Sequence, residues 1–217
     1  MTLTIPKSRC HCRWRRRKEA RPEEIVEAAL ALFVEKGFSA TRMAEVAKQA
    51  GISKGTLYLY FDSKEKIFHA VIQHFITPMI DEVETLVKNY QGSTEALIKQ
   101  LVHGWWGSIW NTPLSGIPKL VISEAGNFPD MARFYMENVV KRVRSLLEQI
   151  IQTGVQRGEF RDVDIPTVTR LLMAPIIQIN IWAHSLRPYD DPQDGDTYIN
   201  LHIDLFLQGL KKHGQNT

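Results

Sequence analysis

The chain has 217 residues, of which 44% are hydrophobic and 24% are charged, and its formal net charge is +3. This composition is that of a soluble globular protein and excludes a wholly disordered chain. Proline and polar residues interrupt the longest charge-free stretches, 100–118 and 171–186, so neither provides the about 20 predominantly apolar residues of a membrane-spanning helix.

The first 20 residues are expected to form a basic flexible arm. Residues 1–75 carry 14 Lys and Arg against 8 Asp and Glu, whereas residues 76–217 carry 13 against 16, and eight of the basic residues lie between Lys7 and Arg21. Such a segment buries too little apolar surface to fold alone. It either neutralises phosphates of a polyanion without sequence preference or is a solvated tail.

Cys10 and Cys12 are the only two cysteines, and they flank His11 in this basic segment. Three adjacent ligand types with no second ligand pair downstream fall short of a tetrahedral zinc site, so we expect no metal here. The two cysteines give no disulfide framework, and no apolar run follows the first methionine as in a secretory signal. A cytoplasmic protein is therefore expected.

The next residues have the apolar spacing of short helices and the residue types that begin and end them. Pro22 begins a first helix that ends at Gly37, and Thr41 is expected to cap a second helix that ends at Gly51. In both helices apolar residues recur every three to four positions, which predicts one buried face.

A third and a fourth helix are expected after tight turns. Ser53 is positioned to cap a helix over residues 54–60. Because only two residues separate this helix from the preceding glycine stop, the second and third helices are predicted to form a helix-turn-helix. The fourth helix begins near Asp62 or Ser63, where Asp62 and Glu65 have the spacing of a capping box.

The rest of the chain has longer and more apolar helical segments, without a credible strand or an internal repeat. The predicted fold class is therefore all-α, with about nine helices. Thr77 and Pro78 are expected to kink or break the fourth helix, because proline removes a backbone hydrogen bond. Further helices are expected over residues 93–110, 114–125, 129–157, 166–186 and 197–212.

Three segments near the start of the chain follow a known family pattern. They read IVEAALALFVEKGF at 25–38, TRMAEVAKQAGISKGTLYLYF at 41–61 and SKEKIF at 63–68. In the order of apolar, glycine and aromatic positions they resemble the DNA-binding domain of the TetR family of transcriptional regulators. After the basic flexible arm over 1–20, the resemblance implies a three-helix helix-turn-helix DNA-binding domain over 21–68 and a larger helical ligand-sensing and dimerisation domain over 69–217.

The third helix is the expected recognition helix. Such a helix presents small or polar groups to the major groove while its other side is buried. Leu57 and Phe61, four residues apart, are the expected buried side. By resemblance, Lys54 and Thr56 are expected to contact base edges, and Gly55 is expected to allow close approach of the backbone. Tyr58 and Tyr60 are expected to contact phosphates or thymine methyls.

Contacts to the DNA backbone are expected from residues at helix N-termini, where amides and basic side chains hold phosphates. These residues are Thr41, Arg42, Ser53 and Lys64. Family members often carry His or Tyr-His before the phenylalanine, but this chain has Leu59-Tyr60, so one common tyrosine contact is missing. The alternative interpretation is that the tyrosines only pack and that Lys54 and Lys64 are only solvated.

The last two expected helices hold more apolar residues than one buried face needs. The surplus predicts, as in the family, a homodimer through a four-helix interface that presents two recognition helices about 34 Å apart to a palindromic site. The residues concerned are Leu171, Leu172, Ile176, Ile177, Ile179, Ile181, Tyr198, Leu201, Ile203, Leu205, Phe206 and Leu210.

The larger domain also gathers aromatic residues and isolated polar residues inside apolar stretches. A small-molecule site needs a mostly apolar cavity with a few hydrogen-bonding groups. The expected lining residues are His103, Trp106, Trp110, Phe128, Met131, Tyr135, Met173, Ile177, Gln178 and Trp182. The alternative is that each of these side chains belongs to the core or to the dimer interface.

The resemblance predicts a ligand-responsive transcriptional regulator. The expected protein is a repressor that binds a palindromic operator in double-stranded DNA as a dimer and that a small hydrophobic or aromatic effector releases. The alternative is a ligand-independent DNA-binding protein that organises the chromosome or recruits a partner protein; activation in place of repression also stays open. The chain has no Gly-rich phosphate loop, metal-spaced His/Glu cluster or nucleophile elbow, so we expect no enzyme, no catalytic residue and no cofactor.

Overall fold

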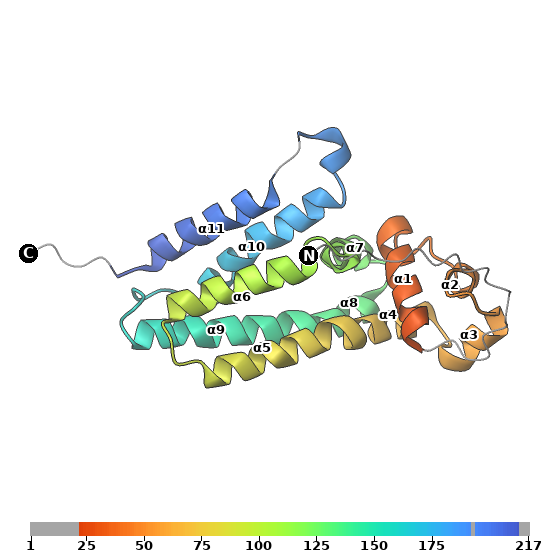
Figure 1. Cartoon of the computed structure of the whole chain (residues 1–217), viewed down its shortest axis with the longest axis horizontal. Coiled ribbons are helices and arrows are strands. Elements are labelled where there is room, and N and C mark those ends of the chain that lie inside the picture. The colour runs from red at the N-terminus through yellow and green to blue at the C-terminus, as the bar shows by residue number, and fades with distance from the viewer. Residues whose placement is uncertain (1–21, 192–193, 213–217) are drawn as a thin grey trace, which may run out of the picture.

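The computed structural model describes residues 22–191 and 194–212, and these residues fold into an all-α structure, as predicted (Figure 1). The basic arm over 1–20 and the Cys10-His11-Cys12 cluster lie outside the described residues. The helices are α1 (Pro22–Lys36), α2 (Met43–Gln49), α3 (Lys54–Tyr60), α4 (Lys64–Val71), α5 (Thr77–Asn89), α6 (Thr94–Ile109), α7 (Ile117–Glu124), α8 (Pro129–Tyr135), α9 (Lys141–Gln156), α10 (Ile165–Ala183) and α11 (Gly195–Leu210).

These helices form nine continuous rods in the described part of the chain, in agreement with the predicted number. The π-helical turn η1 (Ile72–Ile76) joins α4 to α5 without a break, and η3 (Met136–Val140) joins α8 to α9 in the same way. Helix α4 packs on α8 and α5 packs on α9, so these two long rods run side by side in the same direction (Figure 1).

Local signals in the sequence set many of the helix ends. The side chains of Ser53, Ser63 and Ser93 accept backbone N–H groups at the N-termini of α3, α4 and α6. Gly37 and Gly51 follow α1 and α2 with φ of 89° and 69°, a conformation that glycine adopts without steric cost.

Two predicted caps are wrong. Arg42, and not Thr41, is the N-cap of α2. The Thr41 hydroxyl instead donates to the Gly37 carbonyl at 2.7 Å, and the side chain is almost completely buried beneath the loop between α1 and α2. At α4 the cap is the Ser63 hydroxyl, which accepts from the Lys66 amide, so Asp62 does not provide the predicted cap.

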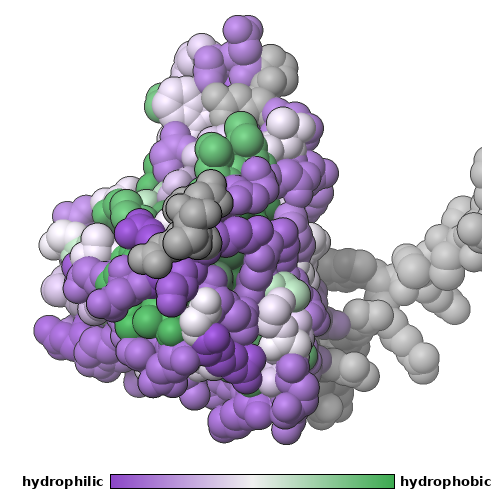
Figure 2. Space-filling view, turned by 90° about the vertical axis from the view of Figure 1, so that its left-hand side faces the viewer, coloured by the Kyte–Doolittle hydropathy of each residue, from purple (hydrophilic) through white to green (hydrophobic). Residues whose placement is uncertain are grey.

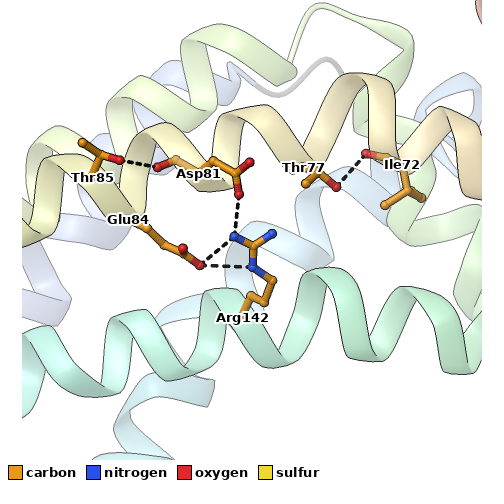
Figure 3. A network of polar contacts seen from close by, with 6 residues as sticks. All are labelled: Ile72, Thr77, Asp81, Glu84, Thr85 and Arg142. Carbon is orange, nitrogen blue, oxygen red and sulfur yellow. Dashed lines mark hydrogen bonds and ion pairs between the residues drawn. The ribbon is translucent and has the colours of Figure 1, made fainter.

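The fourth predicted helix does not break at Pro78 but widens into η1 just before it. Proline lacks an N–H and its ring crowds the carbonyl of the preceding turn, so the regular hydrogen-bond ladder cannot pass through this position. The Thr77 hydroxyl donates to the Ile72 carbonyl at 3.3 Å and binds one carbonyl in the widened turn (Figure 3). The helix predicted over 129–157 contains the second π-turn, η3.

Two hydrophobic clusters hold the described residues together. The first surrounds α1–α4 and includes residues of α7 and α8, with Phe33, Phe68 and Met131 fully buried. The second lies among α6, α9, α10 and α11, with Ile151 and Leu172 fully buried. Helices α1–α4 are therefore packed against one end of the bundle formed by α5–α11 (Figure 1).

None of the described helices combines the length and the apolar character required to traverse a lipid bilayer.

Candidate DNA-binding surface and effector domain

Helix α3 lies at the end of the molecule opposite the C-terminus of α11 (Figure 1). Its first turn is fixed by Ser53, whose side-chain oxygen accepts the Thr56 amide at 3.0 Å. Leu57 is fully buried and Phe61 is partly buried against the first hydrophobic cluster, which is the buried side that the sequence predicts. The outward side carries Lys54, Gly55, Tyr58, Leu59 and Tyr60, all exposed, and the half-buried Thr56.

Polar side chains on α3 contact one another at the surface. Thr56 Oγ1 and Ser53 Oγ are 2.8 Å apart. Lys54 Nζ lies 5.7 Å from the centre of the Tyr58 ring, a cation–π distance. These groups remain where a duplex could reach them, and their contacts to DNA stay predictions.

Leu59 is the residue of α3 for which the sequence predicts no role. It has the most exposed large apolar side chain of this helix. The signal that could have found it was its position four residues after Gly55, on the side of the helix opposite Leu57.

The residues expected at the DNA backbone divide into two pairs. Arg42 and Ser53 are exposed at the N-termini of α2 and α3, where their positions fit the prediction. Thr41 and Lys64 instead bind carbonyl groups of the protein, and their contacts to the DNA backbone stay predictions. Thr41 is buried under its own loop because its hydroxyl pairs with a carbonyl there.

Lys64 is held by the loop between α1 and α2. Its Nζ donates to the carbonyls of Phe38 at 2.7 Å and of Ser39 at 3.1 Å. The same ammonium lies 4.9 Å from the centre of the Phe38 ring and 5.6 Å from that of Phe128. The charge is thus satisfied by two carbonyls of the loop and by two aromatic rings.

The same loop contacts the turn between α7 and α8. The ring of Phe38 meets that of Phe128 edge to face, with centres 4.7 Å apart. The Ser39 amide donates to Glu124 Oε1 at 2.9 Å. A displacement of this turn would therefore be transmitted to the residues that immediately precede the helix-turn-helix.

Helix α4 makes a second contact with α8. The rings of His69 and Phe134 are stacked, with centres 3.7 Å apart and planes 14° apart. His69 Nε2 is buried and has no hydrogen-bond partner among the described residues. Burial lowers the pKa of His69, and the nearby positive charge of Lys66 lowers it further.

An ion network holds α5 to α9 just after the two π-turns (Figure 3). Arg142 on α9 donates to Asp81 Oδ1 at 2.6 Å and to Glu84 Oε1 at 2.8 Å, both on α5. The Arg142 Nε also donates to Glu84 at 3.1 Å. Because one guanidinium bridges two carboxylates, this contact resists sliding of the two long rods past each other.

The structure places the ten predicted effector-binding residues in different surroundings, and their role in binding an effector stays a prediction. His103 and Gln178 are exposed, while Ile177 and Trp182 are half-buried. The other six are divided, because α8 packs with α1–α4 whereas α6 packs in the bundle. Phe128, Met131 and Tyr135 belong to the first hydrophobic cluster, and Trp106, Trp110 and Met173 belong to the second.

Trp106 and Trp110 are the two residues of that predicted set whose rings stack on each other. Their rings are stacked, with centres 4.1 Å apart and planes 18° apart. Trp106 Nε1 donates to Asp196 Oδ1 at 2.7 Å, which joins α6 to the first turn of α11. In the first cluster, burial raises the pKa of Tyr135 to about 12.

Two buried polar groups on α10 lie outside the predicted set of lining residues. Asn180 is fully buried; its amide donates to the Ile176 carbonyl at 2.6 Å, but Oδ1 has no partner among the described residues. Thr169 Oγ1 is also buried and unpartnered. Buried polar atoms are normally paired, so these two atoms are positions at which a polar ligand group or water would be stabilised. A lone Asn in the apolar run of α10 was the signal in the sequence.

The surface of the bundle carries exposed apolar side chains on its last two helices. Leu171 on α10 and Leu201 and Leu205 on α11 are each more than half exposed. Elsewhere, hydrophilic groups cover most of the bundle end remote from α3, with apolar groups between them (Figure 2). The described residues contain no group of His, Cys, Asp and Glu side chains suited to hold a metal ion.

Two family models match the chain. One, described as "Bacterial regulatory proteins, tetR family", matches residues 25–71, and the other, described as "Tetracyclin repressor-like, C-terminal domain", matches residues 90–192. Together they span more than two thirds of the chain and cover both α1–α4 and most of the bundle.

Full-length relatives agree with these matches. The chain is 27% identical over 199 residues to the HTH-type transcriptional repressor KstR2 of Mycobacterium tuberculosis, covering 90% of this chain and 95% of that protein. It is 24% identical over 177 residues to the fatty acid metabolism regulator protein of Bacillus subtilis, covering 80% and 90%. The crystal structure of FadR from Bacillus subtilis in complex with stearoyl-CoA has the same fold, with a TM-score of 0.72 at 20% identity and coverage of 88% and 100%.

Proposed function

Because the chain belongs to the TetR family of transcriptional regulators, we propose that it is a cytoplasmic repressor that binds a palindromic operator as a homodimer and is released by a small hydrophobic effector. The observation that carries this proposal is the arrangement of α3, with Leu57 in the core and a row of small, basic and aromatic residues facing outward at one end of the molecule. A helix with this division can enter the major groove.

We propose the division of labour that the sequence predicts, with an arm over 1–20, a DNA-binding domain over 21–68 and a sensing and dimerisation domain over 69–217. The second boundary lies inside α4, so one helix belongs to both domains. A change in the bundle can thus alter the position of α3 through α4 and through the Phe38–Phe128 contact.

Dimerisation through α10 and α11 is supported by the three exposed leucines on these helices, because burial of such residues in a second copy removes apolar surface from water. Replacing Leu201 and Leu205 together by Asp should yield a monomer in analytical ultracentrifugation. The monomer should lose affinity for a palindrome but bind a single half-site like the wild type. Ile122→Asp, an exposed position on α7, is the matched control and should remain dimeric.

The decisive experiment is selection of bound sequences from random duplex DNA with the full chain. We expect a palindrome with half-site centres about 10 base pairs apart, since two recognition helices of a dimer face the same side of the duplex. Recovery of no preferred sequence would overturn the assignment as an operator-binding regulator.

For the effector we propose a molecule with a long apolar chain and a polar head. The support is the stearoyl-CoA complex of the B. subtilis structure, the apolar second cluster and the unpartnered oxygens of α10. Long-chain acyl-CoA is the first probe, and quenching of Trp106 and Trp110 fluorescence is the readout. Asn180→Leu fills the same space without the unpaired oxygen and should weaken acyl-CoA binding while leaving operator affinity unchanged.

The alternative is ligand-independent DNA binding in chromosome organisation or partner recruitment. The observation that favours it is the separation of the predicted effector residues between two hydrophobic clusters. Operator affinity that no compound of an acyl, sterol and aromatic library changes would support this alternative, whereas release by one compound would support the repressor. The family is one of regulators, and we propose no catalytic role.

A further inference from the structure

One leucine projects from the centre of the outward side of α3. Leu59 is 85% exposed, whereas Leu57, two residues earlier, is 0% exposed. At about 100° per residue, Leu59 lies about 200° and Gly55 about 160° around the helix from Leu57. Leu59 and Gly55 are therefore the two residues of α3 that face most directly away from the core, one turn apart.

The neighbours of Leu59 leave its side chain uncovered. Gly55 has no side chain, and a Cβ built there would meet only Ser53 Oγ, at 3.8 Å. Lys54 is drawn toward the ring of Tyr58, and the Thr56 hydroxyl is paired with that of Ser53. Tyr58 and Tyr60 flank the leucine and are only 45% and 42% exposed. The isobutyl group is thus the apolar feature at the middle of this surface.

A structural role within the chain does not account for this side chain. Packing is excluded because most of its surface is in contact with solvent. A role in the proposed dimer face is excluded because α3 lies at the opposite end of the molecule from α11 (Figure 1). In the major groove, the C5-methyl of thymine is the apolar group that base pairs present, and aliphatic side chains contact it.

We propose that Leu59 is a specificity-determining residue that reads the C5-methyl group of one thymine in each half-site of the operator. This inference rests on the proposed DNA-binding function and adds to it which base the centre of α3 prefers. Gly55 allows the helix to come close enough, and the flanking tyrosines and Lys54 bind around the contact.

Thymine and uracil differ in the major groove only by this methyl group, which isolates the contact. Removing one buried methyl should weaken binding about 3- to 5-fold, so replacement in both half-sites should raise the Kd about 10- to 25-fold. The same replacement should have an effect below about 2-fold when Leu59 is already absent, because coupled contacts are not additive.

The experiment uses the full chain and the duplex obtained by selection. Each thymine is replaced in turn by uracil, symmetrically in the two half-sites, and the Kd is measured for the wild type, Leu59→Ala and Leu59→Met. At one thymine position, replacement by uracil should raise the Kd of the wild type and of Leu59→Met, which keeps an apolar contact. The same replacement should leave the Kd of Leu59→Ala nearly unchanged. Ile122→Ala, an exposed aliphatic residue on α7, is the matched control and should behave like the wild type.

The outcomes separate this inference from the function on which it rests. Selection could yield a specific operator in which no uracil replacement changes the Kd in a way that depends on residue 59. That result would overturn the role of Leu59 and leave the assignment as a regulator intact. If the selection recovers no preferred duplex, the DNA-binding proposal itself is overturned. Because Leu59 is exposed, the variants should unfold at the wild-type temperature, and circular dichroism checks that a lost contact is not a lost fold.

Discussion

Helices α1–α4 and the bundle formed by α5–α11 are built by different means. In α1–α4 short helices are separated by glycines and serines that fix each end, and the outward side of α3 follows from the position of one buried leucine. In the bundle long apolar helices pack on partners that are distant in the sequence. The comparison teaches that a binding surface on one helix can be predicted from local residues, whereas a site between helices depends on packing.

The largest expected effect comes from removing the residue that anchors α3. Leu57→Ala leaves a cavity in the first cluster and should lower the free energy of unfolding by about 2–5 kcal/mol. Four of the five tryptophans, Trp105, Trp106, Trp110 and Trp182, lie in the bundle. On heating, the unfolding transition followed by far-UV circular dichroism should therefore begin at a lower temperature than the transition followed by tryptophan fluorescence.

The matched control for that change is Leu172→Ala, which opens a cavity at a fully buried position of α10. In this variant the unfolding temperature followed by tryptophan fluorescence should fall by at least as much as that followed by circular dichroism. Equal shifts of both signals in both variants would show that the two regions unfold as one unit and would break the comparison.

An intermediate effect is expected at the junction between the two regions. Lys64→Met removes two hydrogen bonds from a charged donor and should lower the free energy of unfolding by about 1–3 kcal/mol. The slope of log Kd against log salt concentration should not change, because the ammonium is bound to carbonyls and not to a phosphate.

Lys54→Met is the control for this junction variant. It should reduce the salt slope by about one while barely changing stability, because Lys54 is exposed on α3. A reduced salt slope in Lys64→Met would show that Lys64 turns to the DNA in the complex, and the boundary between the regions would then be drawn differently.

The smallest effect concerns pH. Burial lowers the pKa of His69 below its ordinary value of 6.5, Lys66 lowers it further, and Glu65 opposes both. The unfolded chain therefore binds a proton more readily than the native chain, so stability is fully present above about pH 6.5 and falls as the pH decreases through that value. His69→Phe keeps a ring on Phe134 and should flatten this part of the pH profile of thermal unfolding.

His184 provides the corresponding test in the bundle. Burial lowers its pKa as well, and Ser115 Oγ lies 2.8 Å from its Nε2. Replacement of His184 by Gln should flatten the profile monitored by tryptophan fluorescence more than the profile monitored by circular dichroism. The opposite order would mean that the junction, and not the bundle, contains the more sensitive histidine.

The structure agrees with some of the sequence predictions for individual residues better than with others. Leu57 was placed correctly because its burial depends only on the helical period of one short segment. Lys64 was placed at a phosphate because its position at a helix start is a local feature, but its two carbonyl partners lie 26 and 25 residues earlier in the chain. Six of the ten predicted effector residues pack in two separate clusters, so a single cavity lined by the whole set stays a prediction.

The sequence by itself determined the all-α class, the helix-turn-helix and the family, because helical period, caps and glycine stops act over a few residues. Only the tertiary structure decided that Lys64 and Glu124 join the two regions and that Asn180 retains an unpaired buried oxygen. These features depend on contacts between elements far apart in the chain, and no local pattern specifies which elements meet.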